Sequence, residues 1–177
     1  MSVTAPLALL AAQLLSSFFA FGLLAQRLSR QLRTWPEGRA LEALVWPHAF
    51  RYIPLGLLAP GQASHEIPRN VLGTIALGDF SSALFALTAL TLLAARAKAA
   101  RSAVWVFSLV SSVDIALALG VGLGHHVYRY PLGMGWFVLT MYVPLVCISQ
   151  WLIFARLRQE RRALAPSGAH LFTQEHP

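Results

Sequence analysis

The sequence predicts an all-α protein, a bundle of five transmembrane helices with its N-terminus outside and its C-terminus in the cytoplasm. Of the 177 residues, 56% are hydrophobic and only 12% are charged, with a mean hydropathy of +0.59. A soluble domain usually carries about 25% charged residues. Long uncharged runs alternate with short basic clusters. This pattern excludes an ordinary soluble enzyme and a disordered chain, and indicates a multi-pass membrane protein.

Four uncharged or nearly uncharged runs are long enough to cross a hydrocarbon core of about 30 Å. They cover residues 3–25, 71–95, 102–124 and 134–155. The first run is not expected to be a cleaved signal peptide, because no Lys or Arg precedes it and because it is longer than the usual apolar region of such a peptide.

The fifth expected span, residues 42–60, is apolar but is interrupted by Pro47, His48, Arg51 and Pro54. The distribution of the 14 basic residues along the chain nevertheless favours a membrane crossing for this stretch. If this stretch crosses the membrane, every basic cluster lies on one side, as the positive-inside rule requires. We therefore expect one bundle over residues 1–156 and a basic, disordered cytoplasmic tail over 157–177.

The net charge of +7 and the isoelectric point near 10.8 could suggest nucleic acid. The basic residues, however, stand in short clusters between apolar runs, where they act as topology signals. The lipid bilayer, and no nucleic acid, is therefore the expected partner.

Three charged side chains lie within the predicted spans: Arg51, Asp79 and Asp114. A charge at mid-bilayer costs about 2.5 to 3.5 kcal/mol on insertion scales, so such residues usually face the protein interior and are paired. Helical spacing would place His48 and Tyr52 on the face of Arg51. The flanking prolines predict a kinked helix that lines a polar cavity.

One Arg against two Asp leaves an unbalanced negative charge, which a proton on His48 or on an Asp, or a bound cation, would neutralise. Two interpretations stay open. The cluster either binds a small lipophilic or cationic ligand or relays a proton, as in a minimal transporter or sensor, or it is a structural clamp that fixes helix packing.

The span 102–124 carries small residues at a strict spacing of four: Ser108, Ser112, Ala116, Gly120 and Gly124. Such a ridge allows another backbone to approach closely. Asp114 lies on the opposite side of this helix. The helix is therefore expected either to be central in the bundle or to place its ridge at the seam of a homo-oligomer.

Sites for metals and cofactors are not indicated. His65, Glu66, His125 and His126 fall in the expected outer loops and are weak metal ligand candidates, because adjacent histidines rarely bind one ion. The single cysteine, Cys147, excludes a disulfide framework. Catalytic motifs are also absent, so we expect no cofactor and a nonenzymatic protein. An enzyme would have to use Asp79, Asp114 and His48 for proton transfer on a lipid-soluble substrate.

The motifs HAFRYIPLG, IALGDF and SSVDIALALG cover residues 48–120. They resemble those of small uncharacterised bacterial inner-membrane proteins, in which a Phe-Arg helix precedes a Gly-Asp helix and a further Asp helix. This resemblance implies a multi-pass protein of the bacterial inner membrane and no known activity.

The last span, MYVPLVCISQWLIFARLR, is similar to the closing helix of emopamil-binding and sterol-isomerase-like membrane proteins. That likeness implies a membrane enzyme in which Tyr142 and Pro144 line a pocket for a lipophilic amine or a sterol, with Asp79 or Asp114 as the acidic partner. Proteins of that family have four helices with both termini cytoplasmic, which departs from the five spans expected here.

Overall fold

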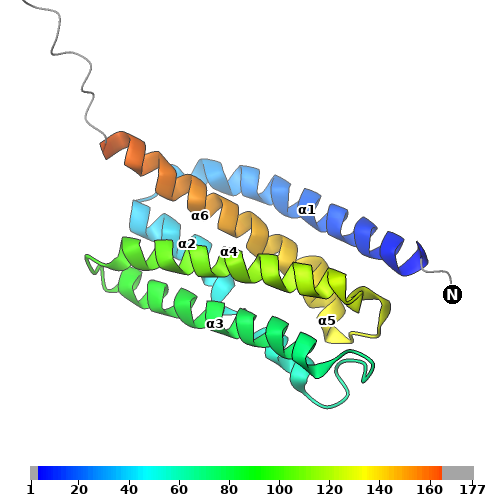
Figure 1. Cartoon of the computed structure of the whole chain (residues 1–177). Coiled ribbons are helices and arrows are strands. Elements are labelled where there is room, and N and C mark those ends of the chain that lie inside the picture. The colour runs from blue at the N-terminus through cyan, green and yellow to red at the C-terminus, as the bar shows by residue number, and fades with distance from the viewer. Residues whose placement is uncertain (1–3, 165–177) are drawn as a thin grey trace, which may run out of the picture.

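The computed structural model describes residues 4–164, and over this range the chain is helical with short connections and no strand (Figure 1). Four helices within it are long and apolar enough to cross a membrane. They are α1 (Thr4–Leu32), α3 (Arg69–Ala94), α4 (Ala100–Gly124) and the last segment, which joins α5 (Met134–Phe137), the π-helical turn η3 (Val138–Tyr142) and α6 (Val143–Leu164). The predicted all-α membrane class agrees with this architecture.

The segment predicted as the kinked span is broken into two pieces. The helix α2 (Glu37–Ala49) contains Pro47 and ends two residues later. A turn follows, and the 3-10 helix η1 (Ile53–Leu58) begins with Pro54 in its first turn. Neither piece alone is long enough to cross a membrane, yet both contact α3, and together they follow its length (Figure 1).

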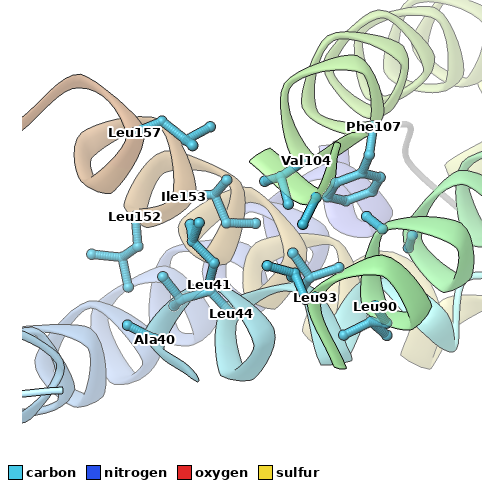
Figure 2. Packing of buried hydrophobic residues seen from close by; sticks show 14 of the residues in the cluster. Ala40, Leu41, Leu44, Leu90, Leu93, Val104, Phe107, Leu152, Ile153 and Leu157 are labelled. Carbon is cyan, nitrogen blue, oxygen red and sulfur yellow. The ribbon is translucent and has the colours of Figure 1, made fainter. Parts of the chain in front are cut away.

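The main hydrophobic core joins α2, α3, α4 and α6 (Figure 2). Phe107 of α4 and Ile153 of α6 are fully buried in it. A smaller core lies toward the other end of the bundle, around Val71 and Val127. The helix α1 is peripheral, because few of its residues are buried and it contacts mainly α6, η3 and the short 3-10 helix η2 (Val127–Arg129).

One end of the bundle carries most of the basic residues, and we call it the basic end: the C-terminal turns of α1 and α6, the start of α2 and the α3–α4 turn. Here Arg156 donates to the Trp35 carbonyl at 3.1 Å, and Arg101 donates to the Leu157 carbonyl at 3.3 Å. The helix α6 runs through Leu164, so it extends into the segment predicted as a tail. Residues 165–177 of that tail lie outside the described part of the chain.

Candidate functional site

Arg51 lies in the turn that follows α2, and its guanidinium is the centre of a buried cluster. Its side chain, only 2% exposed, donates from Nε to Asp79 Oδ1 at 2.7 Å and from Nη1 to Ser111 Oγ at 2.6 Å. The third nitrogen, Nη2, donates to Asp114 Oδ2, which also accepts from Ser82 Oγ at 3.1 Å. The structure thus brings together the three charged residues that the sequence placed in the spans, and one arginine links α3 to α4.

The sequence reasoning missed three residues that hold this cluster together. Ser82 is three residues after Asp79, and Ser111 is three residues before Asp114, so same-face spacing could have found both. The third is Gly78: a Cβ built there would lie 2.0 Å from Asp114 Oδ1. Only a glycine lets α3 approach the carboxylate of α4 this closely.

Tyr142, also predicted for the pocket, closes the cluster on the side of the last segment. Its hydroxyl donates to the Pro47 carbonyl at 2.5 Å. Tyr142 ends the π-helical turn η3, and a π-turn changes the direction in which the following side chains point. The contact therefore joins the last segment to the end of α2, four residues before Arg51.

Two residues predicted for the pocket, His48 and Tyr52, do not line the cavity beside the charge cluster. His48 is fully buried with its ring edge against Phe107, at a centroid distance of 5.0 Å. Neither of its ring nitrogens has a hydrogen-bond partner in residues 4–164. Tyr52 is 48% exposed, with its ring beside Phe50. The prediction used helical spacing across Arg51, whereas α2 ends at Ala49, before Arg51. A role of these two residues in the pocket therefore stays a prediction.

The small-residue ridge of α4 packs inside the chain only at its first position. Ser108 is buried, whereas Ala116, Gly120 and Gly124 are exposed. A Cβ added at either glycine would meet no atom within 4 Å. Ser112, between these two parts, is half-buried. Of the two alternatives, the structure does not show the whole ridge packed within one chain. The seam of a homo-oligomer stays a prediction.

The weak metal candidates do not form a ligand set. His65, Glu66, His125 and His126 are all exposed. Within the described range, no group of three or more His, Cys, Asp or Glu side chains is arranged to hold a metal ion.

A cavity of about 180 Å³ lies next to the charge cluster, in the half of the bundle away from the basic end. Leu72, Ile75 and Asp79 line it from successive turns of α3, so it follows one face of that helix down to the carboxylate. Arg51 lines it beside Asp79. The other lining residues are mostly apolar and come from every segment around it: Leu10, Leu14, Pro54, Leu57, Ile115, Ala118, Leu119, Gly122, Leu123, Val127, Tyr128, Leu132, Gly135, Val138, Leu139, Tyr142, Val143 and Val146.

Asp79 is the acidic group that faces this cavity. Its side chain is 14% exposed, and Arg51 occupies only Oδ1, so Oδ2 has no hydrogen-bond partner among residues 4–164. Asp114 does not line the cavity, and neither does Pro144, which is buried. Of the residues that the sterol-isomerase likeness implied, Tyr142 and Asp79 are therefore the two at the cavity wall.

The comparisons with known proteins give a family and no activity. No curated protein and no solved structure matches this sequence. One family model matches residues 8–158, a range that includes every residue of the charge cluster. The match is consistent with the resemblance to an uncharacterised family over residues 48–120. The chain belongs to the family described as a domain of unknown function (DUF8737).

Proposed function

We propose that this integral membrane protein binds a small lipophilic cation in the cavity, with Asp79 as the residue that recognises the positive charge. The observation that carries the proposal is the unpartnered Oδ2 of Asp79 at the end of an apolar cavity. Because Asp79 lines the cavity, a donor placed there can reach this acceptor, and a charged donor forms the stronger hydrogen bond with a carboxylate.

The charge balance of the cluster favours a cation over a neutral donor. One guanidinium faces two carboxylates, which gives a formal charge of −1 when both are ionised. Asp114 Oδ2 already accepts from Arg51 and Ser82. The uncompensated negative charge is therefore most accessible at Asp79. An ammonium group there would neutralise the cluster and donate to Oδ2.

The size of the cavity limits the ligand to a small molecule. A cavity of about 150 Å³ holds benzene, while sites for drug-sized ligands occupy roughly 300 to 1,000 Å³. At about 180 Å³, the cavity can enclose one ring or a short alkyl chain with an amine, but not a whole sterol. The volume thus argues against a sterol as substrate. The Tyr142 hydroxyl proton is also committed to the Pro47 carbonyl, which makes it a poor acid for an isomerase reaction.

The proposal also covers the topology. Residues 42–60 would complete a fifth crossing as a broken helix, which the contacts of α2 and η1 along α3 support. With the basic end in the cytoplasm of a bacterial inner membrane, the N-terminus and the cavity would lie toward the outside. A ligand would then enter from the outer leaflet.

The test compares benzylamine with toluene, which has a similar shape but no charge and no donor. Binding to the purified full chain in detergent is measured by calorimetry and by the thermal midpoint. Benzylamine should bind at least about tenfold more tightly than toluene, because a charged hydrogen bond contributes about 1.5 to 3 kcal/mol.

Asp79→Asn should remove this preference for benzylamine. The variant is expected to fold, because Arg51 then faces the single carboxylate of Asp114. Glu66→Gln is the matched control, since Glu66 is an exposed acid outside the cavity lining. Equal affinity of the wild type for the two compounds, or equal effects of the two variants, would contradict the proposal.

A further inference from the structure

A second hollow of about 390 Å³ lies between α1 and α6, in the half of the bundle nearest the basic end. We call it the α1–α6 groove. It is separate from the ligand cavity, because no residue lines both. Its lining is Gly22, Ala25, Gln26, Ser29, Leu32, Arg33, Leu44, Ile148, Trp151, Leu152, Ala155, Arg156 and Gln159.

The groove changes character along its length. Its inner part is apolar, with Gly22 and Ala25 on α1 and Ile148 and Leu152 on α6. Toward the basic end the lining becomes polar and charged. The α1 side from Gly22 to Arg33 extends about 16 Å at 1.5 Å per residue. This is close to half of a hydrocarbon core of about 30 Å, so the groove is as deep as one leaflet.

The polar part carries two positive charges, from Arg33 and Arg156, and no acidic side chain of the described range lines the groove. One guanidinium comes from the turn that follows α1, and the other comes from α6. Arg156 also donates to the Trp35 carbonyl at 3.1 Å, which holds its side chain at this end. Guanidinium groups bind phosphate through paired hydrogen bonds, and basic pockets between helices on the cytoplasmic side recognise anionic lipid head groups.

We propose that the α1–α6 groove binds one anionic phospholipid from the leaflet at the basic end. The phosphate lies between Arg33 and Arg156, and one acyl chain lies along the apolar part beside Ala25 and Leu152. A lipid explains both parts of the groove, whereas a free anion would use only the charged part. Because α1 is peripheral, the bound lipid would also add contacts between α1 and α6 along this hollow.

The experiment is native mass spectrometry of the full chain, released from detergent with equal amounts of phosphatidylglycerol and phosphatidylcholine. One phosphatidylglycerol should be retained in preference to phosphatidylcholine. Arg33→Gln should weaken this retention about fivefold, since one basic residue near an anionic lipid contributes about that factor. Arg30→Gln, in the last turn of α1 but outside the groove lining, should leave it unchanged.

Gly22→Leu tests the apolar part independently. A Cβ at Gly22 would meet no atom within 4 Å, so the variant is expected to fold, and its longer side chain should reduce retention of the lipid. Equal retention of the two lipids, or equal losses from Arg33→Gln and Arg30→Gln, would overturn the proposal. Displacement of the lipid by millimolar glycerol phosphate would also overturn it, because the groove would then recognise a free anion.

Discussion

Gly78→Ala should destabilise the protein even though alanine is the better helix former. The added Cβ would lie 2.0 Å from Asp114 Oδ1 and 3.2 Å from its Cγ. To restore even a tight contact of 3.0 Å, the carboxylate must move by at least 1.0 Å. That displacement would lengthen the bonds that Asp114 Oδ2 accepts from Arg51 and Ser82.

The expected loss follows from three contributions. Overpacking typically costs about 1 to 3 kcal/mol. A weakened hydrogen bond to a charged group adds about 1.5 to 3 kcal/mol. Replacing a helical glycine returns about 0.5 to 1 kcal/mol. The net decrease in the free energy of unfolding should therefore be about 1.5 to 5.5 kcal/mol.

Gly73→Ala provides the matched control on the same helix. A Cβ at Gly73 meets no atom within 4 Å, so this change should be neutral or stabilise α3 by up to about 1 kcal/mol. The measurement is the denaturant or thermal midpoint of both variants in the same detergent. If Gly78→Ala were as stable as Gly73→Ala, the close approach of α3 to Asp114 would not exist as described.

Three further predictions address the cluster, His48 and the topology. Arg51→Leu should lower the free energy of unfolding by about 3 to 5 kcal/mol, and adding Asp114→Asn should recover part of that loss. Additive changes in a double-mutant cycle would show that the two side chains do not meet. His48→Leu should leave the unfolding midpoint unchanged or raise it, because buried ring nitrogens without hydrogen-bond partners cost free energy. A clear loss of stability would show that these nitrogens form hydrogen bonds in the folded protein. Cysteines introduced at residues 61–70 should react with an impermeant thiol reagent outside intact cells, and cysteines at 96–101 should not; the reverse pattern would refute the proposed orientation.

The positions of the long helices could be predicted from apolar run length, with errors only at their ends. The first span was predicted to end at residue 25, but α1 continues to Leu32. A helix does not stop where the hydrocarbon core stops, and long basic side chains such as Arg27 and Arg30 can extend toward the head groups. The same reasoning applies to α6, which continues past the predicted boundary at its basic end.

The charge cluster was predictable in outline because ionised groups inside a bilayer must find each other. Which further residues belong to the cluster could not be predicted, because this depends on where α2 ends. Spacing rules assume a continuous helix, and they cannot place Arg51 and Tyr52, which follow the end of α2 at Ala49. A cavity beside the prolines was predicted, but as a polar one. Its mostly apolar lining could not be predicted, because it depends on how α1 and the last segment lie against α3 and α4.

The residues that make 42–60 the weakest predicted span are those that build the site. In a bilayer, irregular backbone is tolerated where it is buried in protein or lines a cavity. Here the chain after α2 does both, since Arg51 is buried and both Arg51 and Pro54 line the cavity. A continuous helix would keep residue 51 on one side of α2, whereas the turn lets its guanidinium reach carboxylates on α3 and α4 at once. Interrupted hydropathy was therefore the strongest sequence signal for the site.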